Sequence, residues 1–169
     1  MPGIAVRPVL PDEFSTLGDL TVAAYRAVPG GSTSAGYEER LRDVASRACD
    51  AVVLVAVAAD GTLLGGVTYV PGPGPYAEFH GDDEAGIRML AVSPAAQGQG
   101  LGRRLVSECI ERATAAGKTR IVLHTTASMT AAHSLYAALG FERAPDRDLD
   151  PSPRTHLIAY TLAISEDGR

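Results

Sequence analysis

The stretch Leu90-Ala-Val-Ser-Pro-Ala-Ala-Gln-Gly-Gln-Gly-Leu-Gly-Arg-Arg-Leu105 joins the end of an apolar run to a segment with helical spacing through a glycine-rich turn. The apolar run begins at Ile87 and breaks at Ser93-Pro94, and the turn carries glycines at alternate positions: Gly98, Gly100 and Gly102. Such a turn presents backbone N–H groups and the positive end of the following helix dipole. Because glycine has no Cβ, an oxyanion can approach the main chain closely. The stretch therefore predicts a phosphate or pyrophosphate site, with a ligand-free strand-to-helix connection as the alternative.

The composition of the 169-residue chain is that of one globular domain spanning 1–169. Hydrophobic residues make up 46% of the chain and the mean hydropathy is +0.05, which excludes a largely disordered protein. A net charge of −5, from 15 basic and 20 acidic residues, argues against a nucleic-acid partner. The sequence shows neither a signal-peptide pattern nor an apolar run of transmembrane length, so we expect a cytoplasmic protein without a membrane partner.

The cysteines and histidines do not have the spacing of metal ligands. Cys49 and Cys109 lie far apart, as is usual for packed, reduced thiols. His124 and His133 have no second ligand-type residue at metal spacing and are interpreted as polar residues at the edge of a site. We therefore expect no metal.

The order of the expected elements predicts an α/β fold. Hydrophobic periodicity and Pro/Gly breaks predict strands at 4–9, 51–58, 63–70, 85–92, 121–125 and 157–164, and helices at 11–28, 37–48, 101–116 and 128–139. Asp60-Gly61 predicts a hairpin between the second and third strands. The strand–helix–strand units require right-handed crossovers with parallel pairing. The result is a mixed sheet with helices on both faces.

Two common phosphate-binding fingerprints do not fit the turn. A dinucleotide fingerprint has the spacing Gly-x-Gly-x-x-Gly near a first strand, whereas this turn has Gly-x-Gly-x-Gly half-way along the chain. An ATPase-type phosphate loop has Gly-Lys-Ser/Thr, whereas Gly102 is followed by Arg103-Arg104. An ATP-binding enzyme is therefore the weakest of the alternatives.

Two motifs together resemble those of the GNAT N-acetyltransferases. Gln97-x-x-Gly100-x-Gly102, preceded by Leu90-Ala-Val-x-Pro, is similar to the acetyl-CoA-binding motif of that family. His133-Ser-Leu-Tyr-Ala-Ala-Leu-Gly-Phe141 is similar to its Leu-Tyr-x-x-x-Gly-Phe signature, at the usual separation. The resemblance implies the acyl-CoA N-acyltransferase fold, with a mixed, mostly antiparallel central sheet of six to seven strands.

The resemblance also implies a set of acetyl-CoA contacts. The main chain of the strand end would pair with the pantetheine arm, and the Leu90 N–H would donate to the acetyl carbonyl. N–H groups of the turn, with Arg103, would hold the pyrophosphate, and Met129, Ala132 and Tyr136 would lie along the cofactor. Met129 stands where relatives often have asparagine, so packing is its expected role. The full predicted set is Leu90, Ala91, Val92, Gln97, Gly98, Gln99, Gly100, Leu101, Gly102, Arg103, Met129, Ala132 and Tyr136. Ser128 is expected to cap the last helix or to reach the cofactor.

The same resemblance suggests two catalytic residues. Tyr136 would act as the general acid that protonates the departing CoA thiolate, the alternative being a tyrosine packed on an apolar stripe. Many relatives carry a glutamate base on the strand, and Gly86 occupies that position here. Glu84, two residues earlier on the same strand face, is the candidate base, with a solvated acid as the alternative.

The functional prediction is a transferase that moves the acetyl group of acetyl-CoA to a primary amine by direct attack. The acceptor would be an amine-bearing small molecule or a protein amine. The alternative is a non-catalytic acyl-CoA-binding or sensory module with the same fold, which the departure at Gly86 favours. Relatives are often dimers, so the resemblance is compatible with a homodimer.

Overall fold

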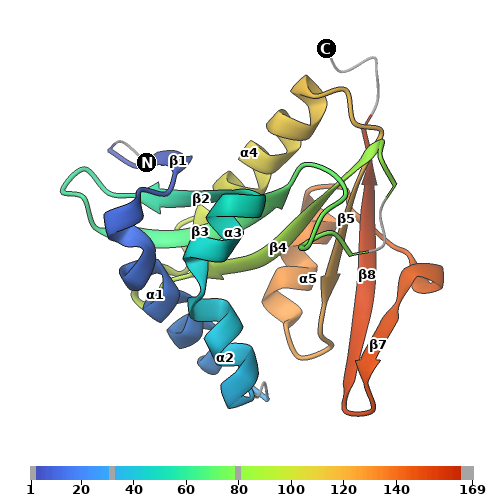
Figure 1. Cartoon of the computed structure of the whole chain (residues 1–169), viewed down its shortest axis with the longest axis horizontal. Helices are drawn as coiled ribbons and strands as arrows, with labels where there is room; N and C mark the ends of the chain where they lie inside the picture. The colour runs from blue at the N-terminus through green and yellow to red at the C-terminus, as the bar shows by residue number, and fades with distance from the viewer. Residues whose placement is uncertain (1–2, 31–32, 79–80, 165–169) are drawn as a thin grey trace.

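The computed structural model describes residues 3–30, 33–78 and 81–164 (Figure 1). The strands are β1 (Ala5–Pro8), β2 (Val52–Val57), β3 (Leu63–Val70), β4 (Glu84–Val92), β5 (Arg120–Thr125), β6 (Glu142–Arg143), β7 (Leu149–Ser152) and β8 (Thr155–Ala163). The α-helices are α1 (Phe14–Arg26), α2 (Ala35–Arg42), α3 (Val44–Asp50), α4 (Leu101–Ala115) and α5 (Thr130–Ala138). Short 3-10 turns are η1 (Pro11–Glu13), η2 (Pro94–Ala96) and η3 (Pro145–Arg147).

The strands form one eight-stranded sheet of order β1-β2-β3-β4-β5-β8-β6, with β7 paired to β8 off this path. β4 and β5 run parallel, and the other pairs are antiparallel. The α4 crossover makes the parallel pairing possible, because parallel neighbours need a long connection. The mixed, mostly antiparallel sheet confirms the predicted fold class, with the short strands β6 and β7 added.

Helices cover both faces of the sheet because the strand residues alternate between two apolar clusters. In β2, Leu54 and Ala56 pack in the cluster that contains Leu105 and Cys109 of α4. The neighbours of these two residues in β2 pack instead with Leu17 of α1 and with α3. Figure 1 shows α1, α2 and α3 on one side of the sheet and α4 and α5 on the other.

A β-bulge in the middle of β4 opens the sheet. Gly66 of β3 faces Ala91 and Thr68 faces Arg88, so two residues of β4 oppose one of β3. Met89, inside the bulge, has a φ of 54°, the one positive φ among the described non-glycine residues. The pairing of β4 with β5 ends at Ile87. Beyond the bulge, the main chain of β4 has no paired strand on its β5 side.

Two local details differ from what the sequence pattern favours. The helix expected at 37–48 is two helices, because Asp43 leaves helical geometry (ψ 65°) and its side chain accepts from the Ser46 N–H at the start of α3. Of the two roles expected for Ser128, capping of α5 is not observed, because Met129 is the N-cap residue. Ser128 instead lines a cavity at the start of α5, and its hydroxyl lies 3.1 Å from that of Thr126.

Candidate active site

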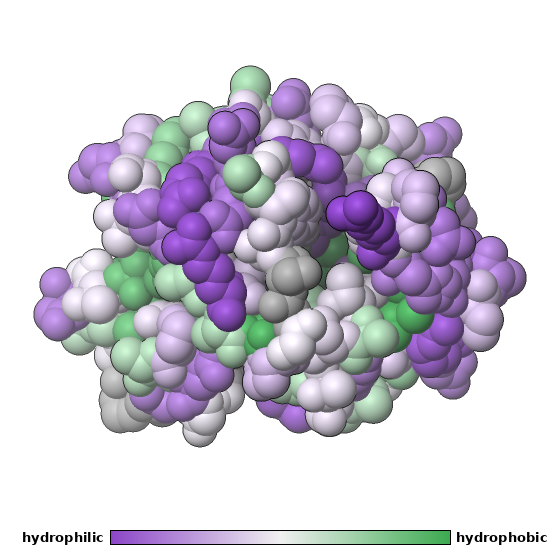
Figure 2. Space-filling view, turned by 90° about the horizontal axis from the view of Figure 1, so that it is seen from below, coloured by the Kyte–Doolittle hydropathy of each residue, from purple (hydrophilic) through white to green (hydrophobic). Residues whose placement is uncertain are grey.

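A large cavity lies where the end of β4, the glycine turn and the start of α5 meet. Its volume is about 410 Å³, and the end of α1 forms the opposite wall. Figure 2 views the molecule from the side on which α2 and α5 begin and β7 ends, and hydrophobic side chains are seen recessed between hydrophilic ones. Most of the predicted cofactor residues line this cavity: Leu90, Ala91, Val92, Gln97, Gly98, Gly100, Leu101, Gly102, Arg103, Met129 and Ala132. Gln99 and Tyr136 do not.

The glycine turn has the geometry of an anion cradle. Gly98 and Gly100 have φ values of 82° and 76°, which L side chains rarely adopt. A Cβ built on either would meet nothing within 4 Å, so the space in front of the turn is open. Gly100 is also the N-cap residue of the 15-residue helix α4, whose dipole adds positive potential. The turn therefore fits a phosphate or pyrophosphate.

The two arginines after the turn have different surroundings. Arg103 lines the cavity. The Arg104 guanidinium lies elsewhere, and its Nη1 donates to the carbonyl oxygen of Ile4 at 3.0 Å. Arg103 is therefore the cation available to an anion in the turn.

Tyr136 of α5 lies outside the lining of both cavities, in an aromatic cluster with Phe141 and Tyr160. Its ring centroid is 5.6 Å from Phe141 and 6.0 Å from Tyr160, and the residue is 5% exposed. Burial raises the pKa of its phenol, so the hydroxyl keeps its proton at neutral pH. Tyr136 also raises the pKa of Tyr25, after the larger effects of burial and Tyr37.

A second, smaller cavity of about 70 Å³ lies at the opening between β4 and β5. β4 contributes residues around Gly86, β5 contributes Val122 and His124, and β8 contributes Leu157. Three tyrosines and an acid complete the lining: Tyr25, Tyr37, Tyr76 and Glu78. Tyr25 lines both cavities, so they adjoin at the end of α1.

The charges around the small cavity form a connected set. Arg88 Nη2 lies 2.7 Å from Glu78 Oε1, and the Arg88 guanidinium lies 5.8 Å from the ring centre of Tyr76. Glu78 Oε2 lies 3.6 Å from Nδ1 of His124. From the sequence, the acceptor is expected between the early helices, the loop at 71–76 and the final strands. No motif connects these segments, so the individual side chains of Glu78, Arg88, Tyr25 and Tyr37 are not predicted.

Glu84 does not line either cavity. Arg147 binds its carboxylate with both terminal nitrogens, at 3.1 and 2.9 Å, and the Gly81 N–H donates to it at 2.8 Å. Desolvation by burial opposes ionisation of Glu84, but these hydrogen bonds outweigh it and the pKa of the carboxyl is lowered. A carboxylate so held is a weak base, so the geometry argues against Glu84 as the group that accepts the proton.

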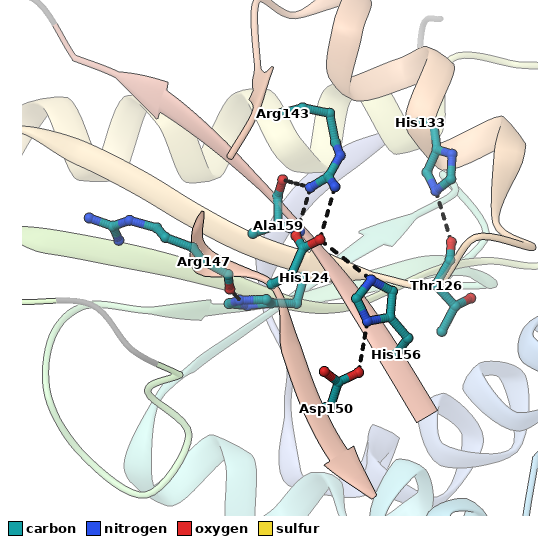
Figure 3. A network of polar contacts seen from close by, with 9 residues as sticks. His124, Thr126, His133, Arg143, Arg147, Asp150, His156 and Ala159 are labelled. Atoms are coloured by element: carbon teal, nitrogen blue, oxygen red, sulfur yellow. Dashed lines mark hydrogen bonds and ion pairs between the residues drawn. The ribbon is translucent and has the colours of Figure 1, made fainter. Parts of the chain in front are cut away.

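The histidines belong to separate polar contacts (Figure 3). His124 Nε2 lies 3.0 Å from the carbonyl oxygen of Arg147, and His133 Nε2 lies 2.8 Å from that of Thr126. His156 lies between Asp150 and Asp148 on the β7–β8 hairpin. Within the described residues, no group of three or more His, Cys, Asp and Glu side chains could hold a metal ion.

Comparison with known proteins connects this geometry to one family. Residues 19–141 match the family model described as "Acetyltransferase (GNAT) family". The chain belongs to the GNAT family. It is 30% identical to mycothiol acetyltransferase of Cellulomonas flavigena over 99% of this chain and 51% of that protein. It is 36% identical to the [ribosomal protein bS18]-alanine N-acetyltransferase of Salmonella typhimurium over 48% of this chain and 56% of that protein.

This GNAT chain thus spans about half the length of these two curated relatives, 51% and 56%. A GNAT acetyltransferase from Brucella melitensis, solved in complex with acetyl-CoA, superposes with a TM-score of 0.68 and 24% identity, covering 96% of this chain and 88% of that one. That likeness confirms the fold. None of the helices in the described part of the chain is long and apolar enough to span a membrane.

Proposed function

We propose that residues 1–169 form a single-domain N-acetyltransferase that moves the acetyl group of acetyl-CoA to a primary amine. The observation that carries the proposal is the pair of adjoining cavities, one beside an anion cradle and one lined by tyrosines and an acid, at the opening between β4 and β5. A cofactor and an acceptor could enter from separate sides and meet there. A cytoplasmic location and a homodimer stay predictions from the sequence.

The large cavity would hold acetyl-CoA, which supplies an acetyl thioester when bound. N–H groups of the turn from Gln97 to Gly102, with the Arg103 guanidinium, would bind the pyrophosphate. The unpaired edge of β4 at Leu90, Ala91 and Val92 would bind the pantetheine arm as a neighbouring strand would. The Leu90 N–H, inside the bulge, would donate to the acetyl carbonyl. Met129 and Ala132 would pack along the arm.

Tyr136 would supply the proton that the leaving thiolate needs. Its raised pKa keeps a proton on the phenol across the pH range of a cell, as a general acid requires. Neither cysteine supports a covalent acetyl-enzyme: burial raises the pKa of the Cys109 thiol to about 12, and Cys49 lies on α3 away from both cavities. Direct attack by the amine is therefore the favoured route.

The small cavity would take the amine end of the acceptor. Its tyrosine faces and the Glu78 carboxylate suit a cationic ammonium group, and about 70 Å³ admits only a small group next to that nitrogen. The names of the relatives include an alanine N-acetyltransferase that acts on a ribosomal protein. An N-terminal alanine is one amine of suitable size.

A non-catalytic acyl-CoA-binding module is the second candidate, and the glycine at position 86 favours it. Calorimetry with CoA and with ATP, followed by thiol release with acetyl-CoA and a panel of small amines, alanyl peptides, polyamines and aminoglycosides, separates the candidates. We expect CoA binding, no ATP binding, and thiol release with at least one amine. CoA binding without turnover of any amine would favour the module, and ATP binding in competition with CoA would reject both.

A further inference from the structure

We propose that His124 is the catalytic residue that accepts the acceptor amine's proton, and that Glu84 positions it through Arg147. This inference rests on the proposed transferase function. His124 fills the role of base that Gly86 leaves open and that Glu84 is unsuited to perform, because Arg147 binds the Glu84 carboxylate with both terminal nitrogens.

His124 faces the small cavity because of its place in β5. Ile121 and Leu123 point into the apolar cluster beneath α4 and α5, so Val122 and His124 point to the opposite side, where they line the cavity. The His124 side chain is 4% exposed, so bulk water has little access to the ring. The position suits a group that must meet a substrate nitrogen rather than solvent.

The hydrogen bond to Arg147 decides which ring nitrogen can act as a base. A carbonyl oxygen can only accept, so His124 Nε2, at 3.0 Å from the Arg147 oxygen, carries the proton (Figure 3). In the neutral ring, Nδ1 then has a lone pair. The nitrogen that can take a proton is therefore the one nearest Glu78.

Glu78 stabilises the charge that His124 gains. Its Oε2 lies 3.6 Å from Nδ1, close enough to attract an imidazolium and too far for a direct hydrogen bond. Arg88 opposes this effect, because it binds the other oxygen of Glu78 at 2.7 Å. The remaining ionisable groups that line the cavity are three phenols: Tyr25, Tyr37 and Tyr76.

Glu84 acts on His124 indirectly, through Arg147. It lies at the start of β4, and its two contacts with the Arg147 guanidinium fix the η3 segment against the sheet. The carbonyl of the same Arg147 holds the His124 ring. The buried carboxylate of Glu84, 63 residues before Arg147 in the chain, is thus a positioning residue for the imidazole.

One proton passes from the acceptor ammonium to His124, and a second passes through Tyr136. A primary ammonium R–NH₃⁺ gives one proton to His124 Nδ1, which later releases it to solvent, and the resulting amine lone pair forms the N–C bond while the C–S bond breaks. Tyr136 gives its proton to the sulfur and regains one from the surplus N–H of the product nitrogen. The sum is an amide, CoA thiol and one proton.

The first test uses the full chain labelled with ¹⁵N-histidine, and needs no acceptor. Long-range ¹H–¹⁵N spectra of its four histidines, assigned with His124→Gln, report which nitrogen holds the proton. We expect Nε2–H for neutral His124. In Glu84→Gln we expect the His124 signal to show a mixture of tautomers, whereas Glu108→Gln, which breaks a surface pair with Arg112 on α4, leaves it unchanged.

The second test measures acetyl transfer to alaninamide, a small primary amine, as a function of pH. We expect His124→Gln to lower kcat by about 10²-fold, to lose the acidic limb of the pH profile, and to keep its affinity for CoA. Imidazole added to His124→Ala should restore part of the rate, which a purely structural role would not allow. His156→Gln on the exposed hairpin should behave as the unmodified protein.

A proton on Nδ1 of the neutral ring, or an unchanged rate and pH profile in His124→Gln, would overturn the assignment. If the unmodified protein binds CoA but does not acetylate alaninamide, that acceptor is wrong, and the spectra still decide the state of His124.

Discussion

Ile87 of β4 and Leu123 of β5 are the last residues that pair across the two parallel strands. Two residues after Ile87, Met89 adopts a left-handed backbone conformation with a φ of 54°. The bulge and the end of pairing coincide. Met89 lines the small cavity, and Leu90, Ala91 and Val92 line the large one. A single local distortion thus provides both the unpaired edge for a cofactor and the access route for an acceptor.

Removing the Tyr136 hydroxyl should separate chemistry from binding. Tyr136→Phe keeps the ring contacts with Phe141 and Tyr160, so the fold and the affinity for CoA should be unchanged. We expect kcat to fall by about 10²-fold, the usual size of a lost proton donor. Steady-state rates and calorimetry on the same preparation measure the two quantities. Tyr160→Phe is the matched control from the same cluster, and an equal loss there would remove Tyr136 from its assigned role.

Neighbouring arginines offer a paired test of the anion site. Arg103→Gln should weaken CoA binding by about tenfold, or about 1.4 kcal/mol, because a charge-assisted contact is lost. The difference should shrink as salt is added. Arg104→Gln loses the bond to the Ile4 carbonyl, so it should lower the melting temperature and leave the CoA affinity alone. Equal effects of the two variants on affinity would place the pyrophosphate elsewhere.

The residues that could be predicted from sequence are those that lie together in the chain. The glycine turn and α5 carry their own local patterns, and the structure brings them together along one cavity. The small cavity has no such pattern, because its side chains come from α1, α2, the β3–β4 connection, β4, β5 and β8. Strand alternation correctly put Glu84 on the face of Gly86, but the ion pair to Arg147 depends on a contact across 63 residues. Pairing across such a distance has no signal in one sequence.

A side chain at Gly100 should block the cradle directly. Gly100→Val places a β-branched residue at a φ of 76° and fills the open space in front of the turn. We expect CoA binding to become undetectable by calorimetry. Gly117→Val is the matched control, because Gly117 has a φ of 73°, equally open surroundings, and lies at the other end of α4. Both variants should lose similar stability, about 1–2 kcal/mol. CoA binding by a folded Gly100→Val would refute the cradle.

The ion pair between Arg26 of α1 and Glu38 of α2 predicts a pH dependence of stability. Glu38 accepts hydrogen bonds from Arg26 at 2.6 and 2.7 Å, and these, with a bond from Thr33, lower its pKa to about 2. Because the carboxyl has the higher pKa of about 4.5 when unfolded, its contribution is complete above pH 4.5 and is lost as the pH falls toward 2. Glu38→Gln should therefore show a shallower fall in melting temperature between pH 5 and pH 2, roughly the interval between the two pKa values.

The matched control for this substitution is Glu39→Gln, one residue along on the exposed side of α2, which should keep the slope of the unmodified protein. The Arg26–Glu38 ion pair also has a functional consequence. It links the segments that carry Tyr25 and Tyr37, whose ring centres lie 6.0 Å apart in the lining of the small cavity. Glu38→Gln should for that reason raise KM for the amine more than it changes the affinity for CoA. A slope identical to that of Glu39→Gln would show that the Arg26–Glu38 pair adds nothing to the folded state.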